Sequence, residues 1–271
     1  MIATTEEEIK ALRSAGKILA GVLADVEALA TDAVSTAELD LAAEHSIRAR
    51  GAVPSFLNYQ PDGASYPYPA ALCVSINDEV VHGIPNEKRL LHSGDIVTVD
   101  AGLSYQGFFV DAARTFIVGD PTDTSYLGGE KSLVMQGLGD TKAHELINAT
   151  RAALLAAIAA AQPGGHIGDI GAAVARIARA HKLGIVEELG GHAVGRAVHE
   201  KPFIPNDGRA GEGEEIKVGM VLAIEPMLAE GKGAVVLAED EWTYRMADGK
   251  RAAHFEETIL VTAKGPEILT R

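Results

Sequence analysis

Apolar residues recur at helical spacing near the start of the chain, and the second half repeats the order of elements found in the first. Over 9–29 they stand three and four positions apart, which is typical of an amphipathic helix. A Ser-Thr-Ala-Glu run at 35–38 offers capping residues for a second helix, which is expected to end near Gly51. Two more helices are expected at about 142–161 and at 167 to about 181, on either side of a Pro-Gly-Gly turn.

Short apolar runs after each helix pair predict β-strands. They lie at 71–76, 95–99, 108–118, 221–224 and 255–261. Two strand entries resemble each other, because Gly94–Asp100 and Gly219–Glu225 both begin at a glycine and end in a carboxylate. Together with the repeated helix pair, they predict an α/β fold of two similar halves related by a pseudo-twofold axis.

The predicted organisation is a single domain over residues 1–271. Its two pseudo-repeats are expected at about 1–120 and 142–271. The connection at about 119–141 is long for a loop inside a compact domain, and it is interpreted as a surface excursion rather than an active-site lid.

Composition narrows the class of protein. Of the 271 residues 47% are apolar, which is ample for a core. The net charge is -14 with no basic block, which argues against nucleic acid or an anionic membrane as the main partner. Cys73 is the single cysteine of the sequence, so no internal disulfide can form. The first residues lack a signal-peptide pattern, and the Ala-rich run 152–161 is too short to span a membrane. A cytoplasmic protein is expected.

Two aspartates flank a predicted hairpin. If Tyr105-Gln106 form a two-residue turn, Asp100 and Asp111 lie directly opposite each other, with Cβ atoms about 5 Å apart. Like charges at that distance need a cation, a shared proton or solvent. The alternative is a pair of exposed aspartates beside a turn, but the apolar flanks Val99 and Val110 favour a metal pair.

Further carboxylates end or begin other strands. Glu225 ends an apolar strand, whereas Glu256 and Glu257 point to opposite faces of another, and periodicity does not decide which of them faces inward. A glutamate buried on a strand needs a partner. Among the histidines, His82, His192 and His199 are candidates for chemistry, and the others are interpreted as structural: His45, His92, His144, His166, His181 and His254.

Five segments in this order resemble the successive motifs of type I methionine aminopeptidases: 77–85, 97–111, 191–202, 223–227 and 255–258. The resemblance covers nearly the whole chain and implies the pita-bread fold, in which two related halves surround a dinuclear metal site. It also implies removal of the initiator methionine from nascent proteins when the second residue is small, through attack of a metal-activated water on the first peptide bond.

The resemblance assigns residues to roles. It places the metal ligands at Asp100, Asp111, His192, Glu225 and Glu256, which settles the choice between the two adjacent glutamates. This oxygen-rich set favours two divalent ions of Mn, Fe(II), Co or Zn without selecting among them. Glu225 is expected to shuttle the proton, His199 to contact the scissile carbonyl oxygen, and His82 to contact the scissile amide nitrogen or the second residue. Tyr68, Cys73 and Trp242 are expected to line the methionine pocket, although Cys73 is equally interpreted as a small buried hydrophobe.

Two other functions compete with this one. A proline-specific peptidase of the same fold usually carries an additional N-terminal domain, and a non-catalytic binding protein of this fold typically loses metal ligands. The aminopeptidase is preferred, with N-terminal methionyl peptides and nascent chains as partners and a monomer as the expected state. The family's task implies transient association with the ribosome, for which the acidic charge offers no support. Ala193 stands where relatives usually have glycine, and this difference is expected to be tolerated.

Overall fold

The computed structural model of the chain describes residues 1–120 and 140–271. Most of the predicted connection, 121–139, lies outside these residues. The helices are α1 (Glu6–Leu29), α2 (Thr36–Ala49), α3 (Thr141–Ala160) and α4 (Ile167–His181). In the described residues no helix is both long and apolar enough to span a membrane.

The two helix pairs predicted from the apolar spacing are confirmed. α1 begins where Thr5 and Glu8 exchange hydrogen bonds between side chain and backbone, and Ser35 and Glu38 do the same before α2. α2 ends at Ala49, two residues before a left-handed glycine at position 51. Each helix buries one apolar face, as the spacing predicts.

The strands form one large antiparallel sheet and two small ones. The large sheet has the order β1 (Val53–Pro54), β4 (Ile96–Tyr105), β5 (Phe108–Ile117), β14 (Glu256–Thr262), β9 (Val221–Ile224), β7 (Gly190–Ala193) and β8 (Glu200–Pro205), with β2 (Leu72–Ile76) paired to β4 and β15 (Gly265–Ile268) paired to β14. One small sheet has the order β13 (Ala252–His254), β10 (Met227–Ala229) and β6 (Gly184–Ile185). The other has the order β11 (Val235–Leu237), β12 (Tyr244–Met246) and β3 (Glu79–Val81).

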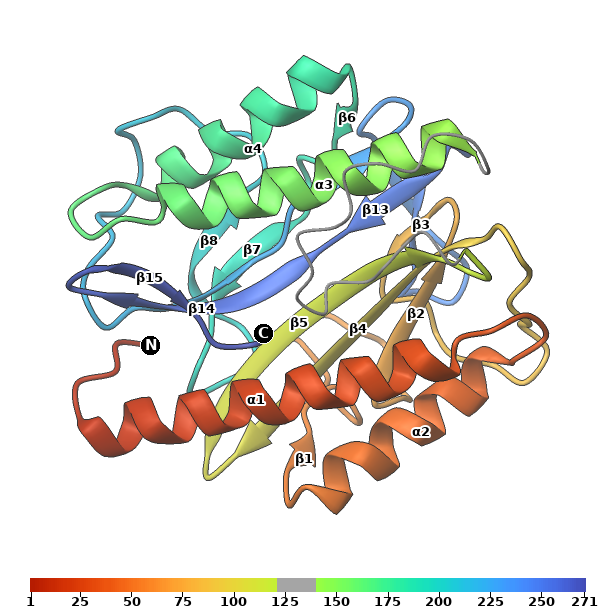
Figure 1. Cartoon of the computed structure of the whole chain (residues 1–271), viewed down its shortest axis with the longest axis horizontal. Coiled ribbons are helices and arrows are strands. Elements are labelled where there is room, and N and C mark those ends of the chain that lie inside the picture. Colours follow the sequence, from red (N-terminus) through yellow and green to blue (C-terminus); the bar gives the residue numbers. More distant parts are fainter. Residues whose placement is uncertain (121–139) are drawn as a thin grey trace.

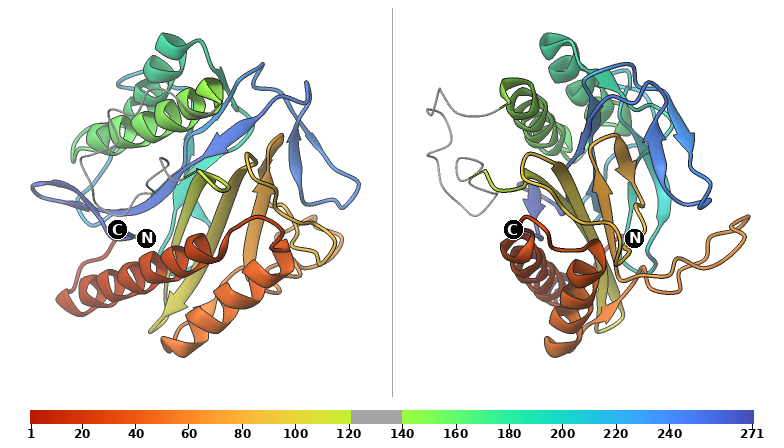
Figure 2. Two further views of the ribbon diagram at one scale, coloured as in Figure 1. Left: turned by 45° about the vertical axis from the view of Figure 1, so that its right-hand side comes forward. Right: turned by 90° about the vertical axis from the view of Figure 1, so that its right-hand side faces the viewer.

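The large sheet has the same plan on both sides of its central pair, β5 and β14. β4 and β9 flank this pair, and each begins two residues after a glycine with positive φ, Gly94 at 95° and Gly219 at 91°. One apolar core joins α1 and α2 to β4 and β5, and a second joins α3 and α4 to β9 and β14. Figure 1 shows the two helix pairs along the two halves of the sheet, and the turned views of Figure 2 show the same arrangement.

The predicted register of the hairpin between β4 and β5 is wrong. The turn is Gln106-Gly107, and both residues have positive φ, 53° and 82°, which is typical of a type I′ turn with glycine in its second position. Asp100 therefore pairs with Ala113 rather than with Asp111, and the two aspartates are diagonal neighbours. Because each partner moves by two positions, both aspartates still point to the same face of the sheet.

That face is the one opposite the first pair of helices. Val97, Val99 and Ala101 alternate with Asp100 along β4, and they pack into the core beneath α1 and α2. The alternation directs Asp100 and Asp111 away from the helices, to the other face of the sheet, where both line a cavity.

Candidate metal centre and substrate pocket

One cavity of about 530 Å³ contains all the site residues predicted from the sequence. The predicted residues that line it are Tyr68, Cys73, His82, Asp100, Asp111, His192, His199, Glu225, Trp242 and Glu256. They come from both halves of the fold, so the cavity forms only where the halves meet.

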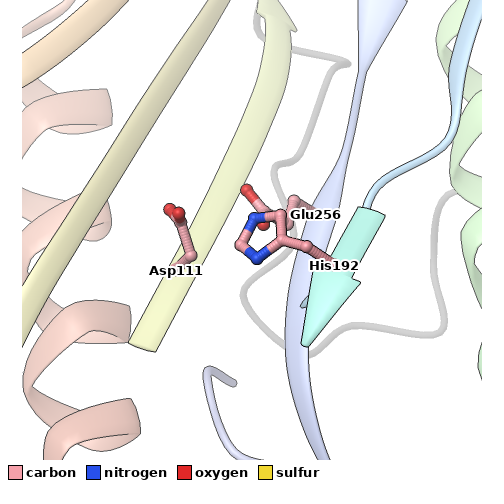
Figure 3. Close-up of side chains that lie close together, drawn as sticks. All are labelled: Asp111, His192 and Glu256. Atoms are coloured by element: carbon pink, nitrogen blue, oxygen red, sulfur yellow. The ribbon is translucent and has the colours of Figure 1, made fainter. Parts of the chain in front are cut away.

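Three potential metal ligands lie close together in the carboxylate-lined part of the cavity, called its acidic floor below. Asp111 on β5, His192 on β7 and Glu256 on β14 each offer an atom, and these atoms lie within 4.8 Å of one another (Figure 3). Their strands are neighbours or near neighbours in the large sheet, which explains how positions far apart in sequence converge.

Asp100 and Glu225 extend this group. Asp100 projects from β4 and its carboxyl contacts that of Asp111. Glu225 follows the last residue of β9, and its Oε1 lies 3.6 Å from Nε2 of His192. The five predicted ligands therefore form one continuous cluster.

Burial makes this cluster a strong acceptor for protons or cations. It raises the pKa of Asp100 to about 7, and it raises the pKa values of Asp111, Glu225 and Glu256 well above the usual range. Among the described residues, Asp100 Oδ1, Asp111 Oδ1 and Glu256 Oε1 are buried without a hydrogen-bond partner. Buried carboxylates that face one another in this way are costly unless cations bind them, so the residues fit divalent metal ions.

His192 is held in the form that a metal requires. Burial lowers the pKa of its imidazole to about 3, which keeps the ring neutral at pH 7. Nδ1 lies 3.0 Å from the carbonyl oxygen of Ala193 and donates to it, so the lone pair is on Nε2, which faces the acidic cluster. Ala193 itself is packed in the second core.

Both adjacent glutamates of β14 are buried, on opposite faces of the sheet. Glu256 lines the cavity, whereas Glu257 lies on the far side, 3.5 Å from the guanidinium of Arg114 and in hydrogen-bond contact with Thr270. Glu257 therefore has the partners that burial requires, whereas Glu256, the one chosen by the resemblance, faces the cavity with its Oε1 unpartnered among the described residues.

His254 belongs to this site, although the sequence interpretation made it structural. It is 1% exposed at the end of β13, and its Nε2 lies 3.3 Å from Glu225 Oε2. His254, Glu225 and Glu256 form a second group whose potential ligand atoms lie within 4.8 Å of one another. The signal for His254 was its position two residues before Glu256, where strand alternation places both side chains on one face.

The other two predicted histidines stand at the wall of the cavity. Nδ1 of His199 lies 2.8 Å from the hydroxyl of Tyr59, a cavity residue that the sequence interpretation missed. Burial lowers the pKa of His199, so the ring is neutral, and a Tyr59 hydroxyl that donates to Nδ1 leaves the proton on Nε2. Burial also lowers the pKa of His82 to about 4, and its ring lies 6.2 Å from that of Trp242.

An apolar wall adjoins the acidic floor. Tyr68, Cys73 and Trp242 pack in one buried cluster with Phe56 and Val198. The rings of Tyr68 and Trp242 meet edge to face at 5.1 Å, and the Tyr68 hydroxyl donates to backbone carbonyls. Cys73 pairs with Asp100 across β2 and β4, so the apolar wall begins next to the potential ligands.

Known proteins resemble this chain over nearly its whole length. The model of "Metallopeptidase family M24" matches residues 10–263. A methionine aminopeptidase of Aquifex aeolicus is 40% identical, over 98% of this chain and 97% of the relative. Methionine aminopeptidase 1 of Mycobacterium tuberculosis is 42% identical, over 97% and 92%. The crystal structure of methionine aminopeptidase from Thermotoga maritima matches with a TM-score of 0.87 and 37% identity, over 100% of both chains, so the chain has the pita-bread fold. The chain therefore belongs to metallopeptidase family M24 and, within it, to the methionine aminopeptidases.

Proposed function

We propose that this chain removes the N-terminal methionine from peptides and nascent proteins whose second residue is small. The observation that carries the proposal is one cavity with an acidic floor and an apolar wall, Tyr68, Cys73 and Trp242, at its side. Such a wall suits the unbranched side chain of methionine, while the floor suits metal-dependent peptide hydrolysis. Since residues of both halves form this cavity, we treat residues 1–271 as one catalytic domain.

We further propose that the cluster holds two divalent ions. Asp100, Asp111, His192, Glu225 and Glu256 are the proposed ligands, and their four carboxylates match the charge of two such ions. The ligand set suits Mn, Fe(II), Co or Zn. When bound, the ions lower the pKa of water and polarise the scissile carbonyl group.

The side chains around the metals have separate tasks. Glu225 takes the proton of the attacking water and delivers it to the leaving amine, as its place between His192 and His254 at the cavity floor allows. His199 donates from Nε2 to the carbonyl oxygen as negative charge develops there, since Tyr59 occupies its other nitrogen. His82 contacts the scissile amide nitrogen or the second residue, where crowding favours a small side chain.

The setting of the reaction is also proposed from the family's task. The enzyme acts in the cytoplasm as a monomer, on chains that leave the ribosome. The net charge of -14 favours no direct contact with ribosomal RNA, so any association with the ribosome is transient.

Peptide selectivity tests the proposed function. With divalent metal supplied, Met-Ala-Ser is expected to release methionine, whereas Ala-Pro peptides and Met-Leu-Ser remain intact. Cleavage of Ala-Pro peptides in preference to Met-Ala-Ser would identify a proline-specific peptidase instead. Metal binding without cleavage of any peptide would identify a binding protein built on this fold.

The apolar wall makes a prediction of its own. Trp242 is 8% exposed and contacts Tyr68, so Trp242→Ala removes a large part of the surface that would cover the methionine side chain. Burying such a side chain is worth about 1.5–3 kcal/mol, so kcat/KM for Met-Ala-Ser is expected to fall by about 10- to 100-fold.

A matched control separates this effect from general damage. Tyr105 is an aromatic residue outside the cavity, so Tyr105→Ala is expected to leave kcat/KM unchanged in the fraction that folds. Unchanged kcat/KM in Trp242→Ala would show that methionine binds elsewhere.

A further inference from the structure

His254 lies beside the ligand cluster, next to Glu225 and Glu256 and behind the cavity lining, and none of the roles proposed above uses it. It ends β13 beside Glu225 and is 1% exposed. Among the described residues neither of its ring nitrogens has a hydrogen-bond partner. Because burial excludes bulk water, a cation is the partner that would satisfy a nitrogen next to two carboxylates.

The spacing around His254 is that of neighbouring ligands on one ion. First-row divalent ions bind nitrogen and oxygen at about 2.0–2.2 Å, so adjacent ligand atoms of one ion lie about 3–3.5 Å apart. Nε2 of His254 lies 3.3 Å from Oε2 of Glu225, within that range. On the other side of the same carboxylate, Nε2 of His192 lies 3.6 Å from Oε1. Glu225 thus presents one oxygen to each of two imidazoles.

The potential ligands form two groups of similar composition. Asp111, His192 and Glu256 form one group, while Glu225, His254 and Glu256 form the other, and Glu256 belongs to both. Each group has carboxylate oxygen and one imidazole nitrogen. A glutamate common to two groups is what a bridging ligand between two ions requires.

We propose that His254 is a metal ligand of this enzyme, and that it binds the same ion as its neighbours Glu225 and Glu256. This assignment rests on the metal centre of the proposed function, and it adds a sixth protein ligand to the five proposed there. A second imidazole makes the centre less dominated by oxygen, which shifts its preference from Mn toward Zn and Fe(II).

Proton NMR of the Co(II)-loaded chain tests the assignment directly. A histidine bound to Co(II) gives an exchangeable ring N–H signal far outside the diamagnetic range. The wild-type chain is expected to show two such signals, and His254→Gln and His192→Gln are each expected to show one. His82→Gln is the matched control, since His82 lines the same cavity without a proposed metal bond, and it is expected to keep both signals.

Metal affinity gives a second, independent readout. Loss of groups that only support a ligand weakens metal binding by about 10- to 100-fold, so loss of a ligand is expected to cost more than about 100-fold. Calorimetric titration with Co(II) is therefore expected to show one of two ions bound more than about 100-fold more weakly in His254→Gln. The titration of His82→Gln is expected to match that of the wild type.

Other results would overturn the assignment. A single shifted signal in the wild-type chain, or two that persist in His254→Gln, would leave His254 as a hydrogen-bond donor to Glu225 and not a ligand. The wild-type spectrum needs no variant, so a variant that fails to fold does not remove the test. Methionine release from Met-Ala-Ser by the same wild-type sample keeps the two proposals apart, because release with one signal rejects only the ligation by His254.

Discussion

Methionine release by Glu225→Gln is expected to be about 10³- to 10⁴-fold slower than release by the wild-type chain. The amide cannot accept a proton from water or return it to the leaving amine, and proton transfer of this kind contributes about 10²- to 10⁴-fold. The upper part of that range is expected because Glu225 also lies 3.6 Å from His192 and 3.3 Å from His254 in the cluster that holds the metal. Steady-state release of methionine from Met-Ala-Ser measures the effect.

The metal content must be known for this comparison. The other proposed ligands remain in Glu225→Gln, so the rates are compared at saturating metal with the bound ions counted. Glu187→Gln, at an exposed glutamate, is the control and is expected to keep the wild-type rate. Activity above a tenth of the wild-type rate in Glu225→Gln with full metal would contradict the role of Glu225 as the proton shuttle.

Arg114→Leu is expected to lower the free energy of unfolding by about 3–5 kcal/mol. The Arg114 guanidinium is buried on the face of the sheet opposite the cavity, 3.5 Å from the carboxylate of Glu257. It also donates to the carbonyl oxygens of Glu256 at 3.1 Å and Thr270 at 2.8 Å. Removing it leaves a buried carboxylate whose remaining partners among the described residues are the neutral Thr270 hydroxyl and the partly exposed Arg271, and breaking a buried pair has a cost of this size.

Denaturant unfolding of a small set of variants checks this value. The double variant Arg114→Leu/Glu257→Leu is expected to recover most of the loss, because no uncompensated charge then remains. Arg48→Leu breaks a surface pair with Glu44, 2.8 Å apart, and is expected to change stability by less than about 1 kcal/mol. If Arg114→Leu cost no more than Arg48→Leu, the buried pair would not hold β5 against β14.

The parts of the fold that could be predicted from the sequence are those set by local periodicity. The helix pairs follow from apolar spacing and from capping residues such as Ser35 with Glu38. The repeated strand entries at Gly94 and Gly219 predicted two halves of the same plan, because each glycine precedes an apolar strand that leads to a carboxylate.

Features set by a single turn or by tertiary contact were harder to predict. The hairpin register depended on placing the turn at Gln106-Gly107. An error of one residue in the turn made Asp111, rather than Ala113, the predicted partner of Asp100. The carboxylate pair was still predicted on one face, because the period of a strand makes a two-residue slip harmless to orientation.

Contacts of the histidines were also hard to predict from the sequence. Sequence alone treated His254 as structural, and only the approach of β13 to the end of β9 places it beside Glu225. Tyr59 was missed for the same reason, since its contact with His199 joins segments 140 residues apart. The contact of Tyr59 with His199 joins the two halves and leaves no local pattern in either segment, whereas the one local signal for His254 was its position two residues before Glu256.

Metal removal and return test the central claim most directly. The chain is stripped with a chelator, its fold is checked by circular dichroism, and methionine release from Met-Ala-Ser is measured before and after Mn, Fe(II), Co or Zn is added. The proposed function predicts loss of release on stripping and recovery with at least one of these metals. Folded protein that releases no methionine with any of them would contradict the assignment as a methionine aminopeptidase.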